Sequence, residues 1–227
     1  MYISEFTDAV RKFKKNLKDK PQGSDHSWEH CYLSFRRACE SGKYDADELS
    51  LNLAFYLASY GMYRGSSFLL KRDYTVHKPV VCELMKEDYR PLRDIKCSEL
   101  LKEEHQDRLE KLKKFMIDYY TPIRDKVRKE EEKKAAAAPL SEILITKILL
   151  GTLGCVPAYD RYFIAGLKYG GFNSFTCNKK SLSELAVFYI QNNKKLENIR
   201  KNTIADGVPY PQMKILDMGF WQIGFDL

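Results

Sequence analysis

The sequence predicts an all-α protein, a single helical domain with few or no strands. Apolar residues recur at three- and four-residue steps in segments along the whole chain, which is the periodicity of amphipathic helices. No series of short alternating segments suggests a multi-stranded sheet. The 227 residues are 44% hydrophobic and 13% aromatic, enough for a sizeable core. We expect one domain over residues 1–227, with a charged and alanine-rich connection at 122–140 between two helical halves.

Breaker and capping residues place the expected elements of the first half. Glycine and proline end helices, and an aspartate or serine before an apolar periodic stretch is typical of a helix start. The expected elements are an amphipathic basic helix over 2–20 that Pro21 breaks, a helix from Ser24 towards Gly42, a helix over Leu49–Tyr60 that Asp47 caps and Gly61 ends, and a short extended segment or turn over Tyr74–Leu84 ahead of another helix.

The second half is predicted in the same way. Residues 98–134 carry a long charged helical pattern, in which Pro122 should interrupt the helix and 128–134 should form a solvated face. Ser141 opens a helix, about 141–153, that is apolar on nearly every side and should therefore be buried. The S-x-x-E spacing of Ser181 and Glu184 predicts a capping box at the start of a later helix.

Composition also bounds the setting and the partners. The formal net charge of +7 permits a polyanionic partner, for which it would supply steering and phosphate affinity. No run of about 18 apolar residues suggests a membrane span, and the N-terminus lacks the pattern of a secretory signal. The six cysteines form no C-x-x-C pair. We expect a cytoplasmic protein with free thiols and no membrane association, and the sequence leaves its oligomeric state open.

Residues 146–170, TKILLGTLGCVPAYDRYFIAGLKYG, carry the strongest functional pattern. A buried helix leads through Gly154 into a turn that contains Pro157, and Asp160 then heads a new helix. This segment resembles the catalytic segment of helix-hairpin-helix DNA glycosylases of the HhH-GPD type, in which an aspartate heads the helix after such a turn. The matching positions are Thr146, Leu150, Gly154, Val156, Pro157, Asp160, Arg161 and Leu167, with one extra residue between the proline and the aspartate.

The resemblance implies HhH-glycosylase-like helix packing and excision of a damaged or modified base from double-stranded DNA. The base would be flipped out of the duplex, and neither a cofactor nor a metal ion would be needed. DNA repair and anti-phage defence are the settings that such an activity suggests. The family's L-P-G-x-G hairpin should fall near residues 135–146, where this chain reads AAAAPLSEILIT, so the hairpin is altered or absent.

The chemistry of base excision supports Asp160 as a catalytic residue independently of the resemblance. Cleavage of an N-glycosidic bond builds positive charge on the sugar, as in other reactions with oxocarbenium-like transition states. A carboxylate close by stabilises that charge and can orient or deprotonate the attacking water. A helix N-terminus keeps such a carboxylate ionised, although an aspartate at this position can also serve only as an N-cap.

Lys147 is the second candidate catalytic residue. It lies in the apolar helix, where a lysine is costly unless its amine reaches water or a partner. Some members of the family use a lysine near the aspartate to form an imine with the sugar, and desolvation makes an amine nucleophilic. Because Lys147 does not stand at the family's hairpin position, we expect water to be the nucleophile and the product to be an intact strand with an abasic site.

The segment from Tyr60 to Ser67, YGMYRGSS, is the candidate for the base pocket or the DNA-facing loop. Its tyrosines can stack on bases, its glycines loosen the backbone, and its arginine can bind phosphate or a base edge. The same residues could instead form a helix–helix junction with aromatic packing. The candidate substrate- and DNA-binding residues are Tyr60, Tyr63, Arg64, Ser66, Ser67 and Arg161.

Two other functions compete with this one. Arg72 and His77 form an R-x4-H spacing that resembles the motif of HEPN ribonucleases, in which the histidine acts on a ribose hydroxyl, although Pro79 follows where that family continues a helix. A non-catalytic DNA-binding protein is the third class, since charge and aromatic residues suffice for it. His26 and His30 stand at i,i+4 spacing, but no third ligand accompanies them, so we expect no metal site.

Overall fold

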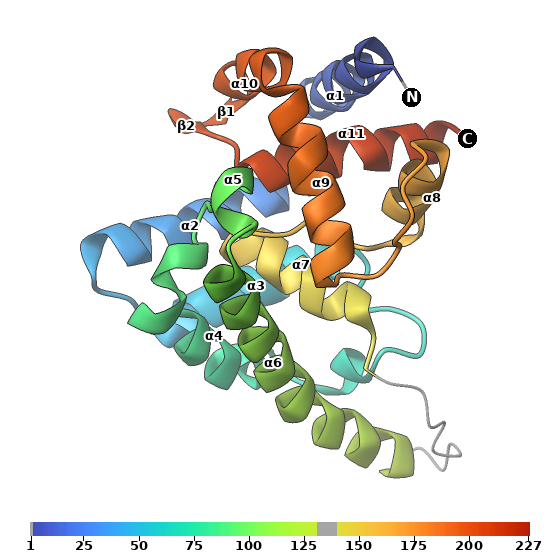
Figure 1. The fold of residues 1–227 in the computed structure, drawn as a ribbon. Helices are drawn as coiled ribbons and strands as arrows, with labels where there is room; N and C mark the ends of the chain where they lie inside the picture. The colour runs from blue at the N-terminus through green and yellow to red at the C-terminus, as the bar shows by residue number, and fades with distance from the viewer. Residues whose placement is uncertain (1, 131–139) are drawn as a thin grey trace.

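The structure is a computed structural model that describes residues 2–130 and 140–227, and within them it confirms the all-α prediction. Helices fill almost the whole of Figure 1. The only strands in this part of the chain are β1 (Ile204–Ala205) and β2 (Val208–Pro209), which pair as a small antiparallel hairpin.

Three of the first four helices begin and end near the predicted breakers. Gly42 ends the second helix in the left-handed conformation, with φ of 67°, and Gly61 follows the third with φ of 76°. The predicted cap of the third helix was wrong by two residues: the side chain of Asp45 accepts the backbone N–H of Asp47, because Asp45 is the last extended residue before the helix. These helices are α1 (Ile3–Lys18), α2 (Ser27–Ser41), α3 (Ala46–Ser59) and α4 (Lys78–Leu84).

Short 3-10 turns join several of these helices. The segment Tyr74–Leu84 is not extended: it forms such a turn and then α4, in which Pro79 stands in the first helical turn, where its missing N–H costs no hydrogen bond. The turns are η1 (Ser24–His26), η2 (Phe68–Lys71), η3 (Tyr74–His77) and η4 (Glu87–Leu92).

After the short α5 (Cys97–Leu100), α6 (Glu103–Glu130) runs without interruption through Pro122, so the predicted break there was wrong. Proline removes one helical hydrogen bond, but burial of an apolar stripe along a long helix outweighs that loss. Residues 122–130 of the expected connection are therefore helical. Residues 131–139 of that connection lie outside the described residues. They include most of the predicted solvated face and the alanine run.

The predicted apolar helix is α7 (Glu142–Thr152), which Ser141 precedes and whose residues 144–152 are all buried. The predicted capping box at Ser181 was wrong, because Asn178 caps that helix and accepts the backbone N–H of Ser181. The Ser181 hydroxyl is buried and bonds instead with the Tyr159 hydroxyl. The last helices are α8 (Arg161–Tyr169), α9 (Lys179–Gln191), α10 (Asn193–Lys201) and α11 (Gln212–Asp226).

One contiguous apolar core includes residues from α1 to α11. The closest packing joins α8 to α11, where a Cβ atom on Gly166 would fall 1.9 Å from the carbonyl oxygen of Phe220. α1 lies along the other side of α11, so that the C-terminal helix is held between the first helix and the helix that Asp160 heads (Figure 1).

Two further predictions concern the whole chain. All six cysteines are free thiols, four of them buried. In the described residues no helix is both long and apolar enough to cross a membrane.

Candidate functional site

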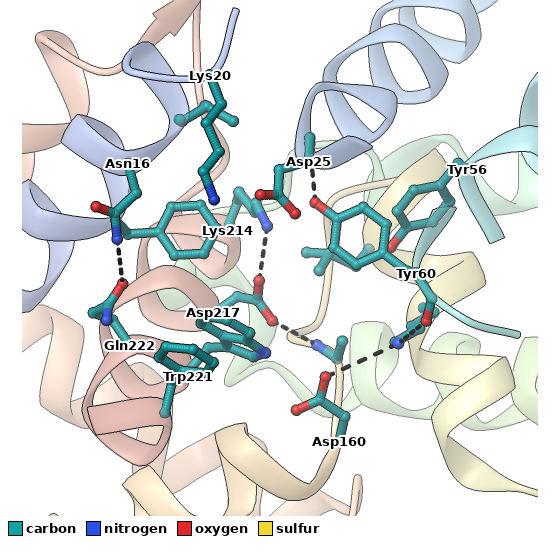
Figure 2. A pocket seen from close by; sticks show the side chains of 16 residues that line it. Asn16, Lys20, Asp25, Tyr56, Tyr60, Asp160, Lys214, Asp217, Trp221 and Gln222 are labelled. Atoms are coloured by element: carbon teal, nitrogen blue, oxygen red, sulfur yellow. Dashed lines mark hydrogen bonds and ion pairs between the residues drawn. The ribbon is translucent and has the colours of Figure 1, made fainter. Parts of the chain in front are cut away.

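The N-terminus of α8 opens onto a cavity of about 350 Å³ that segments from the whole chain enclose. α1 and the loop after it form one wall, the ends of α3 and α7 form a second, and α11 forms the third (Figure 2). This volume suits a small organic ring rather than an extended chain. The lining residues are Phe13, Asn16, Leu17, Lys20, Asp25, Tyr56, Tyr60, Lys147, Leu150, Ala158, Asp160, Lys214, Asp217, Trp221, Gln222 and Phe225.

Asp160 caps α8, as the sequence predicted, and also faces this cavity. Its Oδ1 atom accepts the backbone N–H groups of Tyr162 and Phe163, each at 3.1 Å. Its Oδ2 atom lies on the side of Lys147. Burial raises the pKa of Asp160, and the two N–H groups and the Lys147 amine oppose that rise. The cap therefore uses one oxygen and leaves the other for chemistry in the cavity.

The turn before Asp160 is held from two sides. The Thr146 hydroxyl of α7 accepts the backbone N–H of Tyr159 at 3.1 Å. Oδ1 of Asp217, on α11, accepts the backbone N–H of Ala158 at 3.0 Å. Buried backbone donors require such partners, and these two fix the path of the chain into α8. The position of the Asp160 carboxylate is thus set by packing and hydrogen bonds rather than by a loop of its own.

Lys147 reaches the same cavity from α7. Its Nζ atom donates to the carbonyl oxygen of Tyr60 at 2.8 Å and lies 3.9 Å from Oδ2 of Asp160. Only 8% of the side chain is exposed, so Lys147 is not an ordinary surface lysine. Burial lowers its pKa, while Asp160 and then Asp217 act in the opposite direction. A buried amine beside a carboxylate can donate or accept a proton there, or act as a nucleophile.

A second buried ion pair stands beside the first. Lys214 and Asp217, one helical turn apart on α11, approach to 2.8 Å, and their side chains are 3% and 7% exposed. Figure 2 shows Asp217 between Lys214 and the turn that leads to Asp160. The Lys214 amine also lies over the ring of Trp28, 4.9 Å from its centroid. Removing either partner would leave a charge buried without compensation.

Aromatic rings form much of the remaining cavity wall. Trp221 and Phe225 of α11 stack with their ring centroids 5.0 Å apart, and Phe13 of α1 meets Trp221 edge to face. The Tyr60 hydroxyl donates to the backbone carbonyl of Asp25, which fixes its ring at the opposite wall (Figure 2). Side-chain amides of Asn16 and Gln222 add hydrogen-bonding groups to the wall. Flat aromatic walls with a few polar groups suit a planar heterocycle.

The structure divides the predicted binding residues between different places. Tyr60 lines the cavity with Asp160 and Lys147. Tyr63 instead donates to or accepts from His77 at 2.7 Å in the neighbouring part of the core. Arg161 is exposed, and its guanidinium lies over the Tyr162 ring. The other three, Arg64, Ser66 and Ser67, line a second cavity together with Gly61.

Several cavity residues lay outside the sequence predictions, above all Lys214, Asp217 and Trp221. None of the predicted site residues belongs to the C-terminal helix. A signal was present, however, because Lys214 and Asp217 interrupt an apolar helix at i,i+3 spacing, which is the same anomaly that singled out Lys147. Nothing in the sequence pairs that helix with Asp160, since the two meet through the tertiary contact between α8 and α11.

The geometry at His77 does not favour a ribonuclease. His77 is fully buried, and its two ring nitrogens bond to the hydroxyl groups of Tyr63 and Tyr120 at 2.7 and 2.6 Å. Burial lowers its pKa to about 4. Arg72 points to Glu130, 3.7 Å away. A histidine enclosed in this way cannot contact a ribose hydroxyl.

The two histidines of the i,i+4 pair, His26 and His30, have different surroundings. His26 bonds to Glu29 at 2.6 Å, and His30 is exposed. In residues 2–130 and 140–227, no group of three or more histidine, cysteine or acidic side chains is arranged to hold a metal ion.

Comparisons of the chain with protein-family models, with curated proteins and with solved structures found no match.

Proposed function

We propose that this protein is a DNA glycosylase that hydrolyses the N-glycosidic bond of a damaged or modified base. The observation that carries the proposal is the meeting of Asp160 and Lys147 in one aromatic-lined cavity. The resemblance of residues 146–170 to the glycosylase segment supports it, since the aspartate of that pattern does head a helix and face a cavity. DNA repair and anti-phage defence remain the settings that fit this activity.

In this proposal the extruded base enters the cavity and stacks on the aromatic walls. Base extrusion is necessary because the reacting bond is inaccessible inside the duplex. The sugar would then lie at the cavity mouth near Oδ2 of Asp160, where the carboxylate stabilises the positive charge that develops at C1′. Water adds its hydroxyl to C1′, the bond between C1′ and the base nitrogen breaks, and the departing base takes up the proton.

Lys147 has two roles open to it within this reaction. As an ammonium group it lies 3.9 Å from Oδ2 of Asp160 and favours the ionised form of that carboxylate, while burial lowers the pKa of Lys147 and so acts in favour of the neutral amine. A neutral amine could attack C1′ in place of water. We retain water as the nucleophile, because the Lys147 amine is already engaged by the carbonyl oxygen of Tyr60 at 2.8 Å.

The proposal is tested on duplex oligonucleotides that each carry one damaged or modified base, together with phage DNA that contains modified bases. Abasic sites are quantified with an aldehyde-reactive probe after incubation with the wild type, Asp160→Asn and Asp88→Asn. Asp88 is a matched control because it is a highly exposed aspartate on a different surface element. Abasic sites with the wild type and the control, but not with Asp160→Asn, support the proposal. Equal yields from all three proteins, or no abasic sites from any substrate, count against it.

A further inference from the structure

A buried tyrosine of the Asp160 cavity has a hydroxyl group that the fold does not use. Tyr56 lines the cavity from α3 and is 1% exposed, yet its hydroxyl forms no hydrogen bond with any residue that the structure describes. Its ring packs on Gly151 of α7, where a Cβ atom would fall 2.3 Å from the ring. Burial raises the pKa of the hydroxyl, which therefore keeps its proton. A buried hydroxyl without a partner is costly, so this one favours a ligand that bonds to it.

Lys214 is a second donor of the same cavity. Its amine pairs with Asp217, and the rings of Trp28 and Phe13 lie beside it, with their centroids at 4.9 and 5.4 Å. A lysine ammonium group has three N–H donors and no acceptor, and Asp217 is its one hydrogen-bond acceptor among the described residues. The other donors are therefore left for the aromatic faces and for a ligand in the cavity.

The buried carboxylates of this cavity have little capacity left to accept hydrogen bonds. Oδ1 of Asp217 accepts the Ala158 N–H, and Oδ2 accepts the Lys214 amine (Figure 2). Oδ1 of Asp160 accepts two backbone N–H groups of α8, and its Oδ2 is the atom proposed to face the sugar. The third carboxylate, Asp25, is exposed. Two buried lysines balance two aspartates in charge, so hydrogen bonding rather than net charge decides which ligand fits.

We infer that Tyr56 and Lys214 select a planar heterocycle with ring carbonyl groups and, resting on the proposed function, that this is an uncharged base such as a pyrimidinedione or an oxopurine. A ring carbonyl oxygen accepts from both side chains, whereas an amino group in its place would set a donor against the ammonium group. A base that is positively charged through N-alkylation would also bring its charge close to Lys214. Buried donors select strongly, because a ligand without the acceptor leaves them unpaired.

The same contact would assist base release. When the bond between C1′ and the base nitrogen breaks, its electron pair stays on the base, and the negative charge spreads onto the ring carbonyl oxygens. An ammonium group beside such an oxygen stabilises the departing base until it takes up the proton that the attacking water gives up. Lys214 then acts on the leaving group, and Asp160 acts on the sugar.

Binding of free heterocycles to the full chain tests the selection separately from catalysis. The probes are two matched pairs, uracil with its diamino analogue and hypoxanthine with adenine, because the members of each pair differ by exchange of carbonyl for amino groups on one ring. Both tryptophans of the chain lie at the site: Trp221 lines the cavity, and Trp28 contacts the Lys214 amine. Tryptophan fluorescence therefore reports occupancy of the cavity.

The variants remove one donor at a time. Tyr56→Phe deletes only the hydroxyl, and Lys214→Met is combined with Asp217→Asn so that no unpaired charge stays buried. Tyr89→Phe and Lys113→Met are the controls, because these are a buried tyrosine and a buried lysine that do not line the cavity. Thermal unfolding verifies that each variant is folded. Tyr56→Phe should lose no stability, since its hydroxyl has no hydrogen bond to lose.

We expect both carbonyl compounds to bind, and the amino member of each pair to bind about 10-fold more weakly or less. Tyr56→Phe should weaken binding of the carbonyl compounds by about 2–10-fold and the double variant by about 10–100-fold, whereas the controls should change nothing. Equal affinity within both pairs, no binding of any probe, or unchanged binding in Tyr56→Phe and the double variant would overturn the inference. If the double variant does not fold, the two pairs and Tyr56→Phe decide.

Base release distinguishes this inference from the proposed function. The wild type should release uracil or hypoxanthine from a duplex that contains it, but no N-methylated adenine from DNA treated with a methylating agent. Selective binding of the carbonyl compounds without release of any base would leave the selection standing and count against the proposed function alone. Release of N-methylated adenine without release of any carbonyl base would support a glycosylase and overturn the selection by Tyr56 and Lys214.

Discussion

Nζ of Lys147 lies 3.9 Å from Oδ2 of Asp160, although 13 positions separate the two residues and each belongs to a different helical element. The pair exists because α7 and the N-terminus of α8 are held against each other by the hydrogen bond from Tyr159 to Thr146. The Lys147–Asp160 pair thus brings a desolvated amine and a desolvated carboxylate to the wall of one cavity.

The products of base excision show which chemical role Lys147 has. With water as the nucleophile, treatment with borohydride during the reaction should trap no protein–DNA adduct, and the DNA strand should remain intact at the abasic site. Denaturing gel electrophoresis of the protein and the labelled strand measures both. A trapped adduct that disappears in Lys147→Met would show instead that the amine attacks C1′. Methionine is a suitable replacement because it keeps much of the apolar length of the buried side chain.

The second ion pair makes a prediction about stability. Lys214→Met leaves Asp217 buried without its partner, which should lower the free energy of unfolding by about 3–5 kcal/mol. Adding Asp217→Asn should recover part of that loss, since an amide oxygen can still accept the Ala158 N–H without carrying a charge. Urea unfolding of the two single variants and the double variant measures the coupling. A double variant no more stable than Lys214→Met would show that the buried charge is not the cause.

The close approach of α8 and α11 predicts a strict requirement for glycine. Gly166→Ala would place its Cβ atom 1.9 Å from the Phe220 carbonyl, so the helices must separate, at a cost of about 3 kcal/mol or more. Gly171→Ala is the comparison, because a Cβ atom there meets nothing within 4 Å and only the positive φ adds strain, about 1–2 kcal/mol. Thermal unfolding should rank the two variants in that order, and the reverse order would refute the predicted packing.

The enclosed histidine predicts a loss of stability in acid. The pKa of His77 is about 4 in the folded protein and higher when unfolded, so the unfolded state binds more protons between pH 6.5 and 4. Stability should therefore fall by about 3 kcal/mol as the pH is lowered through that window. His77→Asn should flatten the slope, whereas the exposed His30→Asn should not. Urea unfolding at several pH values measures the slope, and an unchanged slope in His77→Asn would assign the acid sensitivity to other groups.

The sequence predicted the helices well because periodicity and breakers are local signals. The cap at Asp160 and the buried helix after Ser141 follow from such signals and were confirmed. The interruption at Pro122 was wrong because tertiary packing overrides a local preference. At Ser181 the competing cap, Asn178, stood three residues earlier.

The candidate site was predictable only in part. Lys147 could be singled out as a charged residue in an apolar helix, and Asp160 as the residue that heads the helix after the Pro157 turn. The contributions of Lys214 and Trp221 depend on how α11 crosses α8, which no local pattern encodes. The division of Tyr60 and Arg64 between two cavities likewise depends on the turn at Gly61 and on the position of α6.

The central claim is tested most directly by the rate at which Asp160→Asn releases the free base from a substrate that the wild type cleaves. Asparagine caps helices as well as aspartate does, so the variant should fold and bind the duplex normally. Without the carboxylate, single-turnover base release should slow by about 10²–10⁴-fold or more. Mass spectrometry quantifies the base, and anisotropy verifies binding. A variant that binds normally and releases the base at the wild-type rate would contradict the catalytic role of Asp160.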